Sequence, residues 1–268
     1  MAMTDDTAAR LTGLSSALVP IFRGRFCDIL LPNHVAKTFA KDEVMYELGD
    51  RERTLFLVRS GVVKTGTITE NGREIIYDVR KEGDVVGELC CLERPRRDRA
   101  VALEAAETVP VPFDEVMDTL SRHPTLLQGF LEVFAGALAE AYDQVHRLAD
   151  DNVMERLIGI LKMLAAKLGR PSGRLIEINA YLTQKELSEM VVARRERTST
   201  ALNSLRRHGI VQYSSRGHLL IDLAALQSHE SSNDVRSLFD NPVPDVIAIA
   251  DSAGGLCPEG RFPAPPRH

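Results

Sequence analysis

Residues 182–211 read LTQKELSEMVVARRERTSTALNSLRRHGIV and predict two short helices joined by a tight turn. Thr183 and Glu186 match a capping box, in which two side chains satisfy free backbone N–H groups at a helix start. The second helix has one apolar face, formed at helical spacing by Thr198, Ala201, Leu202 and Leu205. Gly209 follows a basic stretch, which is typical of a helix C-terminus. The segment therefore predicts a helix-turn-helix.

The opposite face of the second helix is polar and rich in arginine. Its residues are Arg195, Glu196, Ser199, Thr200, Asn203 and Arg207. A helix that is apolar behind and carries Arg, Glu, Thr and Asn in front is suited to the major groove of DNA. The alternative is an ordinary pair of surface helices with a solvated charged face.

The segment that follows, IVQYSSRGHLLIDL at residues 210–223, predicts a β-hairpin with its turn at residues 214–217. A helix-turn-helix followed by a hairpin is a winged helix. Residues 182–218 contain seven basic and three acidic residues, a net charge of +4, whereas the whole chain carries −5. A positive module on an acidic body attracts phosphate at one face, which favours DNA binding.

Residues 39–92 have a different pattern, with short apolar runs between turns rich in Gly and Asp. The runs are Leu55–Val58, Val62–Ile68 and Ile75–Val79, and the turns are Gly49-Asp50, Gly61, Asn71-Gly72, Gly83-Asp84 and Gly87-Glu88-Leu89. Such spacing predicts an antiparallel β barrel or sandwich. Together with the winged helix, these motifs resemble the catabolite activator (CRP/FNR) family of transcription regulators, over roughly residues 11–226.

The predicted fold is α+β, with a cyclic-nucleotide-binding-type β jelly roll, a long dimerisation helix and a C-terminal winged helix-turn-helix. We place the effector-sensing barrel in residues 1–122, the dimerisation helix in 123–152 and the DNA-binding domain in 153–228. Residues 229–268 are rich in Pro, Gly, Ser and Asp, and we expect them to form a largely disordered tail.

The long helix carries apolar residues at alternating spacings of three and four, the seam of a short coiled coil. They are Leu131, Phe134, Leu138, Ala141, Val145 and Leu148. One alternative is a helix packed only on its own barrel. The family resemblance implies a homodimer through this helix, which fits double-stranded DNA with two half-sites related by two-fold symmetry, and RNA polymerase as a further partner.

The resemblance also implies which side chains contact DNA. Arg195 and Glu196 occupy base-reading positions, Arg towards guanine and Glu towards cytosine. Thr183 and Arg194 occupy phosphate-contacting positions, and Thr200 stands where relatives carry a second base-reading arginine. Lys185 and Ser199 complete the expected DNA-binding set.

The expected effector site lies around Gly87, Glu88 and Leu89, where the family holds a cyclic phosphate and a ribose hydroxyl. With the spacing of the bacterial activator, Asp98 falls on the phosphate-binding arginine. With the spacing of eukaryotic kinase regulatory subunits, Arg97 aligns with that phosphate-binding arginine. Arg97 is the better candidate, because the Asp98 carboxylate would repel phosphate. We include Arg99, Ala100 and Tyr142 in the site. Ala141 and Tyr142 replace the adenine-contacting Thr and Ser of the family, so cAMP is not clearly indicated and another cyclic nucleotide or anionic ligand is an alternative.

Other chemistry has little support in the sequence. The chain contains no nucleophile–base arrangement, no histidine spacing for zinc or haem, and no apolar run of membrane-spanning length. We therefore expect a cytoplasmic regulator that is not an enzyme and holds no metal. Cys90 and Cys91 leave a redox-responsive regulator open as an alternative. A second alternative is a ligand-independent regulator, in which the basic loop that contains Arg94, Arg96, Arg97 and Arg99 binds no nucleotide. A third is a cyclic-nucleotide-binding protein whose winged helix binds protein.

Overall fold

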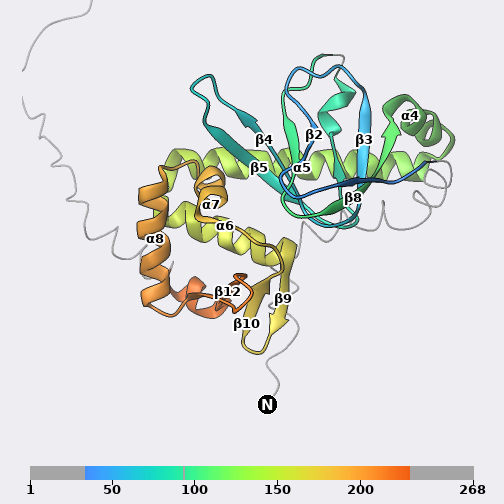
Figure 1. The fold of residues 1–268 in the computed structure, drawn as a ribbon. Coiled ribbons are helices and arrows are strands. Elements are labelled where there is room, and N and C mark those ends of the chain that lie inside the picture. Colours follow the sequence, from blue (N-terminus) through green and yellow to red (C-terminus); the bar gives the residue numbers. More distant parts are fainter. Residues whose placement is uncertain (1–33, 93, 230–268) are drawn as a thin grey trace, which may run out of the picture. The chain divides into compact units, whose positions relative to one another are not determined.

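The computed structural model describes residues 34–92 and 94–229 (Figure 1). The expected disordered tail lies outside these residues from position 230 onward. Across the described residues, no helix is both long and apolar enough to cross a membrane.

The N-terminal part is built from two antiparallel four-stranded sheets, ordered β1-β8-β3-β6 and β2-β7-β4-β5. The strands are β1 Lys37–Phe39, β2 Val44–Tyr46, β3 Thr54–Ser60, β4 Val63–Ile68, β5 Glu74–Arg80, β6 Val85–Val86, β7 Arg99–Ala102 and β8 Ala106–Pro112. Both sheets contribute to one buried cluster, which includes Phe39, Phe56 and Val63. The predicted antiparallel jelly roll is confirmed.

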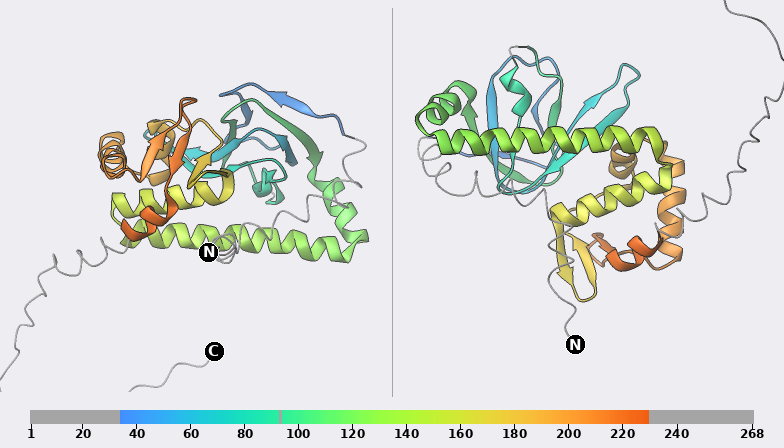
Figure 2. Two further views of the ribbon diagram at one scale, coloured as in Figure 1. Left: turned by 90° about the horizontal axis from the view of Figure 1, so that it is seen from below. Right: turned by 180° about the vertical axis from the view of Figure 1, so that it is seen from behind.

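Two helices follow the barrel. Helix α4 (Phe113–Arg122) was not predicted, and it buries Phe113, Val116 and Leu120 against the barrel. Helix α5 (Pro124–Asp150) is the predicted long helix, with Pro124 in its first turn. It runs along the barrel (Figure 2), and Phe130 near its start is buried in the same cluster as α4.

Helix α6 (Val153–Leu168) begins immediately after α5, because Asn152 caps it and forms a capping box with Glu155. The next helices are α7 (Gln184–Val191) and α8 (Arg195–Arg207). The predicted hairpin forms from β11 (Val211–Tyr213) and β12 (Leu219–Ile221). The winged helix-turn-helix is thus confirmed.

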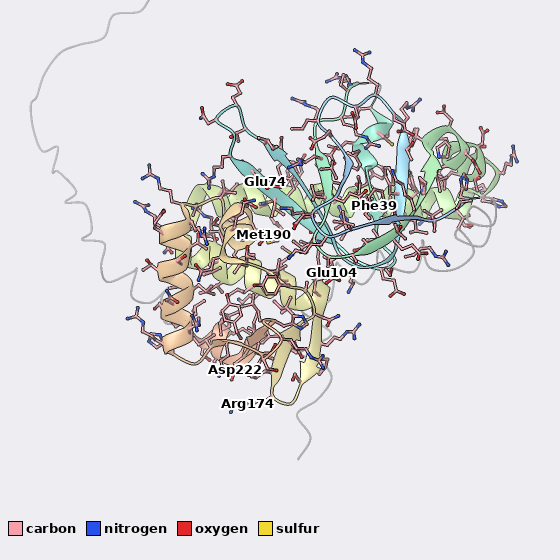
Figure 3. The ribbon with its side chains drawn as sticks, in the orientation of Figure 1. Phe39, Glu74, Glu104, Arg174, Met190 and Asp222 are labelled. Carbon is pink, nitrogen blue, oxygen red and sulfur yellow. The ribbon has the colours of Figure 1, made fainter. Side chains whose placement is uncertain are left out.

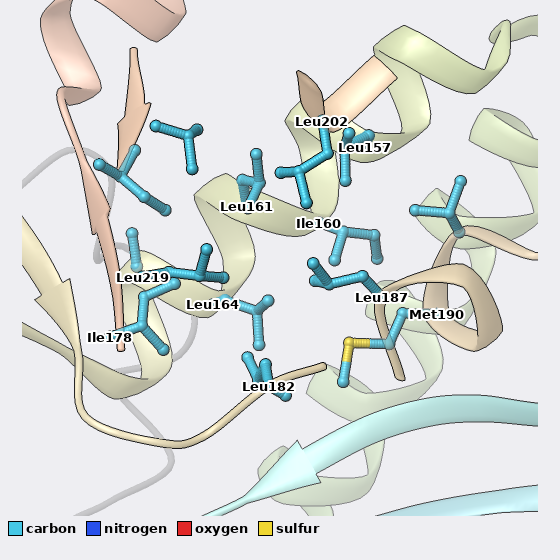
Figure 4. Packing of buried hydrophobic residues seen from close by; sticks show 14 of the residues in the cluster. Leu157, Ile160, Leu161, Leu164, Ile178, Leu182, Leu187, Met190, Leu202 and Leu219 are labelled. Atoms are coloured by element: carbon cyan, nitrogen blue, oxygen red, sulfur yellow. The ribbon is translucent and has the colours of Figure 1, made fainter. Parts of the chain in front are cut away.

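A second hairpin, β9 (Gly169–Ser172) and β10 (Leu175–Ile178), completes a sheet of order β11-β12-β10-β9. It was missed in the sequence, because Arg170-Pro171-Ser172-Gly173 has the composition of a loop. Proline is tolerated there because β9 is an edge strand. Leucine and isoleucine side chains from α6, α7, α8 and β12 fill the core of this domain (Figure 4).

Candidate DNA-binding surface and effector site

The start of α7 is fixed by local chemistry. The Thr183 hydroxyl oxygen accepts hydrogen bonds from the backbone N–H groups of Lys185 and Glu186, and a Glu186 carboxylate oxygen accepts from Thr183 N at 2.9 Å. The predicted capping box is therefore present. Val192, with φ of 54°, makes the turn into α8. This turn sets the angle at which α8 is presented.

Helix α8 divides into a buried and an exposed face, as its sequence predicts. Thr198, Ala201, Leu202 and Leu205 are buried. The exposed face displays Arg195, Glu196, Thr200, Asn203 and Arg207. Glu196 and the arginines offer an acceptor and donors in the combination that reads base edges in the major groove. Arg194, immediately before the helix, is also exposed.

The other three residues of the expected DNA-binding set are already engaged within the protein. Ser199 Oγ donates to Gln184 Oε1 at 2.7 Å, which ties α8 to α7. Thr183 is half-buried in its cap. Lys185 Nζ lies 3.4 Å from Glu74 Oε2 and 3.3 Å from Glu189 Oε1. Burial alone would lower the pKa of Lys185, but these two carboxylates outweigh it and raise that pKa above its ordinary value.

The expected effector site centres on the turn before a short 3-10 helix, Glu88–Cys91. Gly87 has φ of 92°, and an added Cβ there would lie 2.9 Å from Arg96 Nη1. The positive φ therefore strains any side chain at residue 87, and its Cβ would also have to displace the Arg96 guanidinium. Leu89 in the short helix is exposed, whereas Glu88 is half-buried.

Glu88 belongs to a chain of ion pairs that runs out of the site. Arg80 Nη2 lies 2.9 Å from Glu88 Oε1, and Arg80 Nε lies 3.2 Å from Asp78 Oδ2. Asp78 Oδ1 in turn lies 2.6 Å from Lys167 Nζ at the end of α6. Lys167 also contacts Glu140 on α5 at 3.3 Å. Four short contacts thus connect the effector turn with α5 and α6.

The arginines of the basic loop occupy very different environments. Arg97, the expected anion-binding residue, is exposed. Arg96 is buried and donates to the backbone carbonyl oxygens of Gly87 (3.2 Å) and Thr54 (2.6 Å). Its guanidinium also covers the ring of Tyr46, 3.9 Å from the centroid. Arg96 therefore holds the Gly87 turn in place, and sequence reasoning did not single it out.

The remaining expected effector residues are dispersed. Arg99 pairs with Glu47 at 2.7 Å and approaches Glu74 at 3.5 Å. Ala100 is fully buried in the barrel core, and Tyr142 is exposed on α5. Asp98 is buried and accepts a hydrogen bond from the Tyr46 hydroxyl at 2.7 Å. Burial raises the pKa of Asp98 above its ordinary value. The structure thus places Gly87, Glu88 and Leu89 together but Arg97, Arg99 and Ala100 in separate surroundings.

The cysteines after Glu88 contribute to packing. Cys90 is buried in the cluster beneath α4, and Cys91 packs against the same cluster. Burial raises the pKa of the Cys90 thiol to about 11. Since the thiolate is the reactive form, this environment disfavours Cys90 as a redox centre.

Two family models match separate parts of the chain. The cyclic nucleotide-binding domain model matches residues 36–123, and the Crp-like helix-turn-helix domain model matches residues 155–229. The chain thus has the architecture of a regulator with a sensor domain and a DNA-binding domain.

The curated relatives are regulators of this class. The anaerobic regulatory protein of Pasteurella multocida is 26% identical over 71% of this chain and 70% of its own length. The fumarate and nitrate reduction regulatory protein of Salmonella typhimurium is 25% identical over 72% of this chain and 78% of its own. A CRP/FNR family regulator from Thermus thermophilus has the same fold, with a TM-score of 0.59, 22% identity and coverage of 74% and 98%. The chain belongs to the CRP/FNR family of transcription regulators.

Proposed function

We propose that the protein acts as a homodimer in which α5 joins the subunits and α8 of each subunit reads one DNA half-site. The observation that carries this proposal is the apolar strip that α5 leaves exposed. Leu138 is 52% exposed and Val145 is 65% exposed, although both lie on a helix whose start is buried in the barrel. Exposed apolar side chains in a sustained seam are suited to a second helix of the same kind.

Phe134 marks the place where this strip meets the barrel. It is half-buried against the barrel cluster, and its ring is tilted against that of Phe130 at a centroid distance of 4.9 Å. Phe134 therefore packs partly on its own domain. The exposed strip continues beyond it at Leu138, Val145 and Leu148. Leu138 is therefore a sharper test position for the dimer than Phe134.

The test substitutes Leu138→Asp, which would place an unpaired charge in an apolar interface and should leave the protein monomeric in light scattering. Ala139→Asp is the matched control, because Ala139 is also exposed on α5 but lies off the seam. The control should remain dimeric and bind DNA normally. A folded, dimeric Leu138→Asp variant would refute α5 as the subunit contact.

We further propose that an anionic effector binds near Gly87 and Glu88 and acts through the ion-pair chain. A ligand group that hydrogen-bonds Glu88 competes with Arg80 for its carboxylate. The ion pair between Arg80 and Asp78 would then become stronger, and Asp78 is also the partner of Lys167 on α6. Effector occupancy would thereby bias the position of α6 and the DNA-binding domain, and the DNA-bound dimer would recruit RNA polymerase.

A further inference from the structure

The β4–β5 hairpin of the barrel grips the first helix of the helix-turn-helix through a cluster of charges. Glu74 on β5 (Figure 3) lies 3.1 Å from Lys64 Nζ on β4 and 3.4 Å from Lys185 Nζ on α7. Glu189, also on α7, lies 3.3 Å from Lys185 and 4.0 Å from Lys64. Two lysines and two carboxylates from the two domains therefore share one cluster, and Arg99, 3.5 Å from Glu74, adds a further cation to it.

Most of this cluster is shielded from water. The exposed fractions of the Lys64, Glu74 and Glu189 side chains are only 6%, 16% and 9%, whereas that of Lys185 is 60%. Charges in such surroundings depend strongly on their partners, because separation leaves them buried and uncompensated. The cluster meets solvent chiefly at the open side of Lys185.

The tip of the hairpin adds a contact at the turn between α7 and α8. Arg73 Nη2 donates to the backbone carbonyl oxygen of Ala193 at 3.0 Å. Apolar packing supports the same arrangement, since Ile76 and Val79 of β5 belong to one buried cluster with Leu187 and Met190 of α7. The hairpin thus holds both the helix and the turn that orient α8.

The position of Glu74 has a consequence for DNA binding. A phosphate that approached Lys185 would meet the Glu74 carboxylate on the same ammonium group and would be repelled by it. We infer that the β4–β5 hairpin is an autoinhibitory clasp, in which Glu74 competes with the DNA backbone for Lys185. This inference rests on the proposed DNA-binding function, in which Lys185 is an expected member of the DNA-binding set, and it gives Lys185 the role of a phosphate contact.

The test compares Glu74→Gln with wild type for binding to a mixed-sequence DNA duplex at low salt, by fluorescence anisotropy. Such a duplex reports phosphate contacts without knowledge of the operator. Glutamine keeps an oxygen acceptor for Lys64 but removes the charge that repels phosphate. We expect affinity to increase about fivefold, the size of one partly exposed ion pair. Circular dichroism and thermal unfolding establish that the variant is folded.

Two matched comparisons separate the clasp from general electrostatics. Glu107→Gln removes the same charge from the barrel at a surface pair with Arg59, and we expect it to change affinity little. In a Lys185→Gln background, Glu74→Gln should no longer tighten binding. The clasp is overturned if Glu74→Gln leaves affinity unchanged, or tightens it equally with and without Lys185.

The same experiment tests the phosphate contact separately. If Lys185→Gln weakens duplex binding in the Glu74→Gln background, where the carboxylate no longer competes, the phosphate contact is supported; if it has no effect there, the contact and the clasp both fail. Should Glu74→Gln not fold, Arg73→Ala gives an equivalent test, since it releases Ala193 without touching the buried charges. Removal of its positive charge alone would weaken DNA binding, so this variant is compared with Arg59→Ala, which removes the same charge from the barrel surface. Tighter binding than that of Arg59→Ala supports the clasp, and equal or weaker binding overturns it.

Discussion

Lys167 Nζ lies 2.6 Å from Asp78 Oδ1, and this contact joins α6 of the DNA-binding domain to β5 of the barrel. Both side chains are largely buried, and Lys81 reinforces the contact by donating to the backbone carbonyl oxygen of Lys167. Asp78 also receives Arg80, so one carboxylate compensates two buried cations. The stability of the domain junction should therefore depend on Asp78 more than on any surface ion pair.

Asp78→Asn should lower the free energy of unfolding by about 3–5 kcal/mol, because it leaves Lys167 and Arg80 buried without their shared charge. Urea denaturation measures this loss. Asp114→Asn is the control, since Asp114 pairs with Arg53 at 3.1 Å but is 81% exposed, and we expect it to cost less than about 1 kcal/mol. Equal costs at the two positions would contradict the importance assigned to Asp78.

The cost of Asp78→Asn should also depend on pH. Burial alone would raise the pKa of Asp78, but Arg80 and Lys167 outweigh burial and hold that pKa below its ordinary value of 3.8. A carboxyl with a lowered pKa in the folded state contributes stability above its unfolded pKa and loses it as the pH falls through the folded value. The difference between wild type and Asp78→Asn should thus be full at neutral pH and shrink below about pH 4. A difference that grew towards acid pH would reverse the assigned sign.

We expect Arg96 to contribute to the free energy of unfolding and Arg97 to contribute little. Arg96→Ala removes donors from two buried carbonyl oxygens and removes one of the two arginines whose charge stabilises the Asp98 carboxylate, and we expect a loss of about 2–4 kcal/mol in unfolding free energy. Arg97→Ala, one residue away on the surface, should change stability by less than about 0.5 kcal/mol. Urea denaturation of the two variants measures both losses of unfolding free energy. Similar losses would contradict the structural role assigned to Arg96.

These two arginines show what the sequence could and could not predict. The capping box of Thr183 and Glu186 and the two faces of α8 depend on residues a few positions apart, so local spacing was sufficient. The burial of Arg96 depends on Thr54 and Tyr46, which are 42 and 50 positions away. No local pattern distinguishes it from the arginines beside it, and motif spacing pointed to Arg97 instead.

The contacts between domains were beyond the sequence for the same reason. Lys185 was expected to belong to the DNA-binding set because of the family resemblance, and its helix formed as predicted. Its partner Glu74 is 111 positions away on another domain, and no local pattern in either segment predicts the ion pair. Likewise, the spacing on α5 predicted the apolar seam, but the packing of Phe134 on the barrel cluster depends on residues far away in the sequence.

Two substitutions on α8 should distinguish a residue that reads bases from one that contacts phosphate. Arg195→Ala should cost about 1–3 kcal/mol on a specific operator and flatten the preference for one base pair. Arg197→Ala removes the same charge from the side of α8 next to the buried face, and it should weaken all sequences similarly. Operator selection from a random DNA pool, followed by titration of single-base variants, gives both numbers. If Arg195→Ala weakened every sequence equally, Arg195 would not be a base reader.

The effector proposal can be decided by calorimetry with cAMP, cGMP and cyclic dinucleotides. Because Arg97 is an exposed cation in the loop that follows the Gly87 turn, Arg97→Ala should weaken the binding of an anionic nucleotide about tenfold or more. Arg94→Ala is the matched control, because Arg94 is another exposed arginine of the same loop, and this variant should bind the nucleotide normally.

We expect cAMP to bind weakly, since Ala141 and Tyr142 are exposed on α5 and do not supply the family's usual pair of adenine contacts. Heat from none of these nucleotides, with DNA binding intact, would favour a ligand-independent regulator. Equal loss in both arginine variants would instead indicate attraction by the whole basic loop rather than a site at Arg97.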